Sequence, residues 1–549
     1  MNLDKPIHEI ISLLKGGNIT SKDELNRVKL DISKKYHLNR VIKDSEILDR
    51  LDISERKIFL RLLQKKPTRT ISGVAVVAVM TRPHKCPHGR CKYCPGGPEI
   101  NVPQSYTGEE PATRRAIQYS FHPYLQTTFR LYQLKSIGHP IDKIELIVMG
   151  GTLTAQCIDY QEWFVKECLR AMNEFSKNYD IIKRYGDDKF LKKFESEQKR
   201  FYYMEGIQKE NENSMVRCVG ITFEPRPDWA KREQINLMLK FGVTRVETGV
   251  QNPFDFIYKR VDRGHTVDDV VEATQQMKDS GLKVSYHMMP GILGNRPELD
   301  FHAFEMIFND ERFRPDMVKI YPCVVIRGTE YYKKWKTNEF QPIKTNDAVN
   351  LIVRVKKIMP PWIRTMRIMR DIPSNLIEAG VKASNLGELV YKRMNELNVR
   401  CRCIRCREVG RFISKDIEPQ IDDIRLKRID YKASKGNEIF LSFEDIKRDI
   451  LIGFIRLRVP HKPFRSEIDE ETALIRELHI YGPMVEIGEK PSYEWQHRGY
   501  GKELLSEAER ISREEFDKKR ILVTSGIGVR GYYRKFGYKK IGVYMGKKL

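Results

Sequence analysis

Val74-Ala-Val-Val-Ala-Val-Met80, followed shortly by Cys86-Pro-His-Gly-Arg-Cys91-Lys-Tyr-Cys94-Pro-Gly-Gly97, is the stretch that decides the fold. Its first part is a short apolar run of the kind found in buried parallel strands. Its second part is a glycine- and proline-rich loop with three thiols. Three soft thiolates at this spacing can hold one cubane iron–sulfur cluster and leave one iron without a protein ligand. A zinc ion completed by His84 or His88 is the alternative.

Further short apolar runs follow along the chain and alternate with helical stretches. This alternation predicts an α/β fold in which parallel strands and crossover helices form a partial (βα)6 TIM-like barrel. In such a fold the loops after the strands carry the function. The predicted strands span residues 74–80, 144–149, 216–223, 245–250, 283–289 and 317–322. A charged insertion over residues 177–214 is expected to be a surface excursion.

Chemically useful residues stand where several of these strands end. Gly150 and Gly151 close the second strand, Glu224 follows the third and Gln251 the fourth, while Arg263 comes one short helix later. A glycine pair lets the backbone approach a ligand without a Cβ in the way. Such residues at successive strand ends indicate a binding site rather than chance.

Together with the cysteine loop, these residues resemble the radical S-adenosylmethionine (SAM) family, in its coproporphyrinogen-dehydrogenase-like branch. The resemblance implies a [4Fe–4S] cluster on Cys86, Cys91 and Cys94, and SAM bound by Gly150, Gly151, Glu224, Gln251 and Arg263. The family usually separates the first two cysteines by three residues, whereas four separate them here. His287 stands where an aspartate is common in the branch, and Lys283, on the same predicted strand, is expected to point into the barrel and help with catalysis.

A second cysteine group, Cys401-Arg-Cys403-Ile-Arg-Cys406, lies between the barrel and the C-terminal part of the chain. This tight spacing favours a zinc ion completed by a remote ligand, acting as a structural clamp. A second iron–sulfur cluster is the alternative. The isolated cysteines are expected to be buried hydrophobic residues: Cys157, Cys168, Cys218 and Cys323.

A second α/β pattern begins near residue 416, with predicted strands at 451–458, 484–487 and 520–524. The segment Gln496-His-Arg498-Gly499-Tyr-Gly501-Lys502 then opens a helix, and a helix N-terminus with glycines favours a diphosphate. With Tyr532-Tyr533 further on, this pattern resembles the GCN5-related acetyltransferases. The alternative is a helix cap and a tyrosine pair in the core.

The acetyltransferase resemblance implies that acetyl-CoA binds here. The diphosphate would lie on Gln496, Arg498, Gly499, Gly501 and Lys502, and Tyr533, next to Tyr532, would lie near the thioester sulfur and act in catalysis. Glu477, Glu486 and Glu489 are available as a general base, and nothing singles one out.

Charge and length indicate a large, nucleic-acid-binding protein. A chain of 549 residues is too long to fold around a single hydrophobic core, so at least two domains are expected. The formal net charge of +24 should attract a polyanion. Residues 1–72 look helical, with Ile7, Ile10, Ile11 and Leu14 on one face and a capping box at Ser21 and Glu24. Basic residues crowd the end of this segment: Lys65, Lys66, Arg69 and nearby Arg82. It is expected to grip RNA; a solvated helical extension is the alternative.

The order of these parts resembles the family of the catalytic subunit of Elongator, in its stand-alone archaeal-type form. The expected domains are 1–72 (basic helical, tRNA-binding), 73–390 (radical SAM), 391–415 (zinc-binding linker) and 416–549 (acetyltransferase-like). The resemblance implies formation of 5-carboxymethyluridine at the wobble position, with acetyl-CoA as carbon source and a 5′-deoxyadenosyl radical. A protein lysine acetyltransferase with a structural cluster, and a non-catalytic RNA-binding scaffold, are the alternatives.

The expected partners are the anticodon stem-loop of a tRNA and an electron donor, with a second copy of the chain as a further option. No apolar stretch approaches the roughly 18 residues of a membrane span, and the first apolar run lacks the features of a signal peptide. The sequence therefore predicts a cytoplasmic location without a membrane partner.

Overall fold

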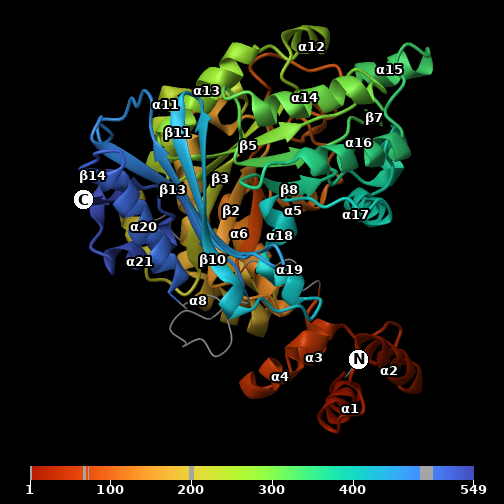
Figure 1. Ribbon diagram of the computed structural model, residues 1–549. Coiled ribbons are helices and arrows are strands. Elements are labelled where there is room, and N and C mark those ends of the chain that lie inside the picture. The colour runs from red at the N-terminus through yellow and green to blue at the C-terminus, as the bar shows by residue number, and fades with distance from the viewer. Residues whose placement is uncertain (1–2, 66–69, 72, 197–202, 483–498) are drawn as a thin grey trace.

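Seven parallel strands, in the order β1-β2-β3-β4-β5-β6-β8, form the central sheet of the computed structural model (Figure 1). The structure describes residues 3–65, 70–71, 73–196, 203–482 and 499–549. The strands are β1 (Ala75–Met80), β2 (Lys143–Met149), β3 (Arg217–Phe223), β4 (Arg245–Gln251), β5 (Lys283–Met288), β6 (Met317–Ile320) and β8 (Arg364–Ile368). The first six are the predicted strands. The predicted partial barrel is confirmed, and a seventh strand, β8, extends it to a half-barrel in which β1 and β8 are the two edges.

Helices in the connections cover the outer face of this sheet, as Figure 1 shows for α13, α14 and α16. Proline in the first turn helps α5, α6 and α14 begin, because its missing N–H has no intrahelical acceptor there. The helices are α5 (Pro111–Gln118), α6 (Pro123–Ser136), α7 (Ile158–Asn173), α11 (Arg232–Lys240), α12 (Asp255–Arg260), α13 (Val267–Asp279), α14 (Pro297–Asn309), α15 (Glu330–Lys336), α16 (Thr345–Ile358) and α17 (Leu386–Glu396). A small antiparallel pair, β7 (Val325–Ile326) and β9 (Ile377–Ala379), accompanies them.

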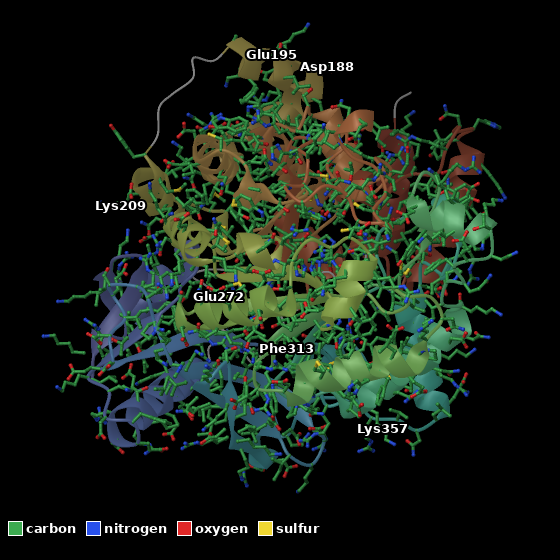
Figure 2. The ribbon with its side chains drawn as sticks, turned by 90° about the horizontal axis from the view of Figure 1, so that it is seen from above. Asp188, Glu195, Lys209, Glu272, Phe313 and Lys357 are labelled. Atoms are coloured by element: carbon green, nitrogen blue, oxygen red, sulfur yellow. The ribbon has the colours of Figure 1, made fainter. Side chains whose placement is uncertain are left out.

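The charged insertion folds into α8 (Phe175–Tyr185), α9 (Asp187–Ser196) and α10 (Met204–Asn211). Helix α9, with Asp188 and Glu195, lies at one edge of the molecule, far from Lys357 of α16 at the opposite edge (Figure 2). The expectation of a plain surface excursion is wrong for α10, because Met204 and Ile207 are buried in the main core. Gln208, on the same helix, accepts a 3.0 Å hydrogen bond from Arg530 in the C-terminal domain.

The C-terminal sheet has the order β10-β11-β12-β13-β14-β16-β15. Its strands are β10 (Ile424–Ala433), β11 (Gly436–Asp445), β12 (Ile450–Val459), β13 (Thr472–Ile480), β14 (Arg520–Val523), β15 (Lys539–Ile541) and β16 (Tyr544–Lys548), with helices α20 (Tyr500–Glu514) and α21 (Arg530–Arg534). Two predicted strands correspond to β12 and β14, and the third, at 484–487, lies outside the described residues. Strands β13 and β14 pair in parallel only from Thr472 to Ile475 and then separate.

The N-terminal segment is a helical module with its own core. Its helices are α1 (Asp4–Lys15), α2 (Lys22–Lys35), α3 (Asp44–Leu48) and α4 (Ile53–Leu63). Ile7, Ile10 and Leu14 are buried together as predicted, and the capping box at Ser21 and Glu24 is present. Lys66 and Arg69 lie outside the described residues. In Figure 1 the module projects from the rest of the chain.

Eight buried charges join the half-barrel to the C-terminal sheet. Asp316, just before β6, receives both Nη atoms of Arg476 at 2.6 and 2.7 Å, and Arg458 binds Asp279 and Glu438. The four cations and four carboxylates of this interdomain ionic cluster balance one another: Lys278, Arg456, Arg458 and Arg476 with Asp279, Asp316, Glu438 and Glu477. Because its charges balance and each has a partner of opposite sign, this cluster can be buried between the two domains.

No helix in the described part of the chain is long and apolar enough to cross a membrane.

Candidate functional site

The cysteine loop after β1 covers the carboxyl ends of the strands. Cys91 and Cys94 are buried and Cys86 is half-buried. The three sulfur atoms do not gather within 4.8 Å of one another, unlike the second cysteine group. A single zinc ion with 2.3 Å bonds would bring its thiolates to about 3.8 Å of one another, whereas a four-iron cubane spreads them more widely. The wider spacing of Cys86, Cys91 and Cys94 therefore fits a cluster better than zinc.

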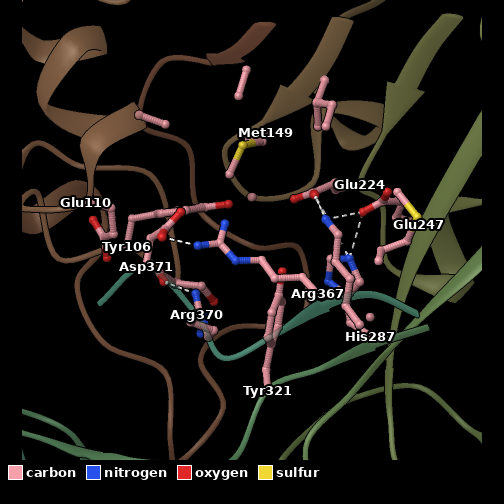
Figure 3. A pocket seen from close by; sticks show the side chains of 18 of the residues that line it. Tyr106, Glu110, Met149, Glu224, Glu247, His287, Tyr321, Arg367, Arg370 and Asp371 are labelled. Atoms are coloured by element: carbon pink, nitrogen blue, oxygen red, sulfur yellow. Dashed lines mark hydrogen bonds and ion pairs between the residues drawn. The ribbon is translucent and has the colours of Figure 1, made fainter. Parts of the chain in front are cut away.

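Beneath this loop lies a cavity of about 670 Å³, here called the first cavity (Figure 3). Residues predicted from the strand ends line it together: Cys86, Gly151, Glu224, Gln251 and Arg263. Gly150 has φ +113°, and a Cβ there would come within 2.5 Å of the Thr81 hydroxyl, so this position requires glycine. Gln251 is not a glycine, yet its φ is +67°, a conformation that is uncommon for such residues and is often found at functional sites.

Arg263 is held in place by three contacts. Its Nη2 donates to Gly249 O at 2.6 Å, its Nε to His265 at 3.1 Å, and its Nη1 lies 3.6 Å from Cys91 Sγ. The buried Arg226 Nη1 in turn donates to Arg263 O at 2.7 Å. These contacts fix the guanidinium of Arg263 beside the cysteine loop. Arg226 was not predicted as a site residue, because no sequence motif marks it.

A buried ionic group lies at the base of the first cavity. Lys319 Nζ contacts Glu224 at 2.9 Å and also pairs with Glu247, and His287 Nε2 lies 3.0 Å from Glu247. Figure 3 shows Glu224, Glu247 and His287 turned toward one another, with Tyr321 beside His287. Burial would raise the pKa of Glu247, but Lys319 and Arg245 hold it well below its usual range. The ligand atoms of Glu224, Glu247 and His287 lie within 4.8 Å of one another, and Lys319 already contacts both carboxylates of this group.

His287 thus turns toward Glu247, and the residues predicted for this cavity did not include the whole ionic group. Glu247 and Lys319 were not predicted as site residues. Their role depends on the pairing of β4 with β5 and of β5 with β6, which brings together residues 72 positions apart.

A second cavity, of about 390 Å³, lies at the opposite, amino-terminal end of the strands. Lys283, at the start of β5, lines it and does not line the first cavity. Its far wall is β13 of the C-terminal domain, which contributes Glu477 and His479, together with Tyr481 just after the strand. Burial lowers the pKa of His479, which favours its neutral form. The two cavities adjoin, because both are lined by Val76, Met366 and Arg405.

The second cysteine group is compact. The sulfur atoms of Cys401, Cys403 and Cys406 lie within 4.8 Å of one another, as ligands of a single ion do. Lys356 Nζ, fully buried, lies 3.2 Å from Cys403 Sγ. Burial would lower the pKa of Lys356, but the three thiols raise it well above its usual range. Together the cysteines and the lysine can hold a metal whose excess thiolate charge is compensated locally.

Cys406 lies in the short helix α18 (Ile404–Arg407), which α19 (Val409–Ile413) follows, and Ile404 packs into the C-terminal core. The group therefore lies where the core of the half-barrel meets the core of the C-terminal sheet. Among the isolated cysteines, Cys168, Cys218 and Cys323 are buried as expected, but Cys157 is exposed, because it precedes α7 in a surface loop.

The predicted acetyl-CoA site has its described part at the start of α20. Gly499 caps this helix with φ +96°, and its carbonyl oxygen accepts hydrogen bonds from the N–H groups of Lys502 and Glu503 at 2.9 and 3.1 Å. A Cβ on Gly501 would come within 2.7 Å of the Tyr532 hydroxyl, so Gly501 and Tyr532 are in close contact. Tyr533 is buried and packs edge-on against Tyr532. Lys502 lies in the same first turn, while Gln496, Arg498, Glu486 and Glu489 lie outside the described residues.

Four family models match consecutive parts of the chain. They are the ELP3 N-terminal domain (residues 3–71), the radical SAM superfamily (80–300), the radical SAM C-terminal domain (315–396) and the GNAT acetyltransferase family (411–538). The radical SAM family implies a [4Fe–4S] cluster and SAM, and the GNAT family implies acetyl-CoA.

Curated relatives match over nearly the whole length. The tRNA uridine(34) acetyltransferase of Methanocaldococcus infernus is 52% identical, over 99% of this chain and 98% of its own, and that of Methanocaldococcus jannaschii is 51% identical, over 99% and 97%. Elongator complex protein 3 of Homo sapiens is 40% identical, over 99% and 96%. The solved structure of archaeal Methanocaldococcus infernus Elp3 with an N-terminal deletion (1–46) matches with a TM-score of 0.74 and 50% identity, over 87% of this chain and 100% of that one.

Proposed function

This chain belongs to the family of the archaeal tRNA uridine(34) acetyltransferases and Elongator complex protein 3, and from this premise we propose that it modifies uridine 34, the wobble uridine, of tRNA. The proposed product is 5-carboxymethyluridine, with the added carbons taken from acetyl-CoA. One observation carries the proposal: the cavity under the cysteine loop adjoins the cavity against β13, with three lining residues in common. Two chemistries in adjoining cavities can act on the same two-carbon unit.

The radical half of the site uses residues of the first cavity. When bound, a [4Fe–4S] cluster and SAM supply a 5′-deoxyadenosyl radical for hydrogen abstraction. Cys86, Cys91 and Cys94 would hold the cluster, and Arg263 offsets negative charge beside Cys91. Gly151, which lines the first cavity, would leave the backbone open to the amino end of SAM, and Gly150, packed against Thr81, would hold the turn that presents it.

Glu224 and Gln251 complete the proposed SAM site. The carboxylate of Glu224 is held by Lys319 at 2.9 Å, which orients it to accept hydrogen bonds from a ribose. The strained backbone of Gln251 aims its amide into the same cavity.

The acetyl half of the site uses the C-terminal domain. Gly499, Gly501 and Lys502 would hold the coenzyme A diphosphate at the start of α20, where the positive end of the helix dipole favours an anion. Gln496 and Arg498 belong to the same proposed set. Tyr532 and Tyr533 would lie beside the thioester. Lys283 is proposed to act on the acetyl-derived unit, because it lines the cavity against β13.

The finer assignments belong to the same proposal. We assign zinc to Cys401, Cys403 and Cys406, because their sulfur atoms are close enough for one tetrahedral ion. The proposed domains remain 1–72, 73–390, 391–415 and 416–549. The N-terminal module would grip the tRNA, an electron donor would reduce the cluster, and the location would be cytoplasmic; a homodimer is part of the proposal without a specific interface.

The rival function, lysine acetylation, has weaker support. It would need a base to deprotonate an amine, and Glu477 is the described candidate. Glu477 accepts a 2.9 Å hydrogen bond from Arg456 Nε. Burial would raise the pKa of Glu477, but Lys283 and Arg456 lower it, which makes this carboxylate a weaker base.

The test is nucleoside mass spectrometry of tRNA incubated anaerobically with reduced protein, SAM and acetyl-CoA. We expect 5-carboxymethyluridine and 5′-deoxyadenosine from the wild type, and neither from Cys91→Ala. Undiminished uridine modification by Cys91→Ala would rule out the radical route. Robust lysine acetylation of proteins without tRNA would favour the rival function.

A further inference from the structure

Charges that line the second cavity do not balance. Among the described residues, its lining carries four cationic side chains and three carboxylates: Arg245, Lys283, Arg364 and Arg405 with Glu145, Glu408 and Glu477. Each carboxylate already has an arginine partner. Arg245 contacts Glu145 at 2.6 Å, Arg364 contacts Glu408 at 2.8 Å, and Glu477 binds Arg456 from behind the cavity wall.

Arg405 and Lys283 are thereby left without an ion pair within 4 Å in the described part of the chain. The Nη1 of Arg405 donates one hydrogen bond, at 3.3 Å, to Met366 O. A guanidinium carries five N–H donors in a planar fork that matches a carboxylate, so most of its capacity remains available.

The place of Arg405 distinguishes it from other surplus cations. It lines both cavities, whereas Lys283 lines only the second. It belongs to the compact cysteine group, between Cys403 and Cys406, so a metal there would fix the backbone that carries it. The thiolates do not need its charge, because Lys356 lies against Cys403 Sγ at 3.2 Å.

We propose that Arg405 binds the carboxylate of a two-carbon acyl unit where the two cavities meet. The inference deepens the proposed function and rests on it for the identity of the ligand. Hydrolysis of the thioester leaves a carboxylate, either on free acetate or on the carboxymethyl substituent of the uridine. An anion at this point carries one charge, which matches the single surplus cation that both cavities share.

A backbone phosphate of the RNA is the competing anion, and the cavity favours the smaller ligand. The second cavity is about 390 Å³ and ends on Glu477 and His479 of the acetyltransferase strand. A phosphodiester would have to bring its neighbouring nucleotides along, whereas the acyl unit is the group on which both halves of the site act.

The experiment measures acetate binding to the anaerobic, cluster-loaded protein by saturation-transfer NMR of the acetate methyl group. We expect saturable binding to the wild type and no competition by acetamide, which has the same shape without charge. Arg405→Gln should weaken acetate binding by about tenfold to a hundredfold, the effect of losing one charge-assisted pair. Arg405→Lys should retain part of it.

Arg402→Gln is the matched control, because Arg402 stands in the same cysteine loop but its side chain is exposed. It should bind acetate like the wild type. Zinc content and melting temperature, measured for each variant, show whether the loop is intact; a loss of acetate binding in Arg405→Gln with both unchanged supports the proposal.

A second arm separates the two sources of the carboxylate. The affinity of the protein is measured for anticodon stem-loops that carry either uridine or 5-carboxymethyluridine. If the wild type prefers the modified loop and Arg405→Gln does not, the carboxylate that Arg405 binds is that of the uridine substituent. If Arg405→Gln loses only acetate binding, the carboxylate is that of free acetate. Equal acetate binding by wild type and Arg405→Gln, or a uniform loss of affinity for both stem-loops with acetate unaffected, overturns the proposal. None of these binding measurements requires catalytic turnover. A failure of the proposed function is therefore distinguishable, because the wild type would then bind acetate but leave uridine unmodified.

Discussion

Asp316→Asn should strongly destabilise the junction between the two domains. Asp316 is fully buried and receives two hydrogen bonds from Arg476, with Lys278 at 3.5 Å and Arg456 at 3.7 Å. The variant keeps the shape but gives the balanced interdomain ionic cluster one uncompensated positive charge. Breaking a buried pair in this way costs about 3–5 kcal/mol. At about 2–4 °C per kcal/mol for domains of this size, the melting temperature should fall by about 6–20 °C.

Differential scanning calorimetry of the holoprotein measures this shift, and Asp310→Asn is the control. Asp310 pairs with Arg312 at 2.7 Å, but on the surface, so its loss should cost at most about 1 kcal/mol. Adding Arg476→Met to Asp316→Asn restores charge balance and should recover part of the loss. A melting temperature for Asp316→Asn within 1–2 °C of the wild type, roughly the effect of a surface pair, would refute the reasoning.

The pH dependence gives an independent check. Burial would raise the pKa of Asp316, but Arg476 and Lys278 hold it well below its usual range. Because the folded pKa is lowered, the stabilisation is fully present above the unfolded value of about 3.9 and disappears as the pH falls through the folded value. The difference between wild type and Asp316→Asn should thus be constant from about pH 8 to pH 5 and shrink only below about pH 4.

Three further predictions concern the sites. Lys319→Met leaves Glu224 and Glu247 without their ammonium, so SAM affinity measured by anaerobic calorimetry should fall about tenfold or more, the scale of one charged hydrogen bond; an unchanged affinity would show that Lys319 does not position Glu224. Tyr533→Phe should keep the fold and the cluster but lower acetyl-CoA turnover, and wild-type turnover would remove Tyr533 from the site. Binding of tRNA should weaken steeply with salt: in a plot of the logarithm of the binding constant against the logarithm of the salt concentration, each phosphate neutralised should add roughly one unit of negative slope. A binding constant that does not change with salt would mean that the net charge of +24 does not drive tRNA binding.

The half-barrel was predictable where its strands are apolar. The six predicted strands agree with β1 to β6 to within two residues at either end, because parallel strands covered by helices form apolar runs. Strand β8 was missed because two of its five residues are arginines, Arg364 and Arg367, which line cavities and interrupt the apolar pattern.

The strands of the C-terminal sheet were harder to predict, because charged residues interrupt their apolar pattern as well. Strand β13 contains Arg476, Glu477 and His479, which face the other domain or the second cavity. Their burial depends on partners such as Asp316, 160 residues away, and no local pattern reveals such a partner. Glu224, Gln251 and Arg263 could be proposed from the sequence, because Glu224 follows β3, Gln251 ends β4 and Arg263 comes one short helix later, and all three line the first cavity. Lys319 and Glu247 could not, since only the folded sheet brings them together.

The position of β13 at the floor of the half-barrel affects how truncations should be interpreted. Glu477, His479 and Tyr481 form the wall of the second cavity, which adjoins the first. A shortened chain that ends before the acetyltransferase domain would therefore open the interior of the barrel to bulk solvent from below. In such a fragment, solvent that enters the barrel would quench the radical, so radical activity would be lost even if acetyl-CoA took no part in that step. Point variants at the start of α20 are thus the sound way to separate the two halves.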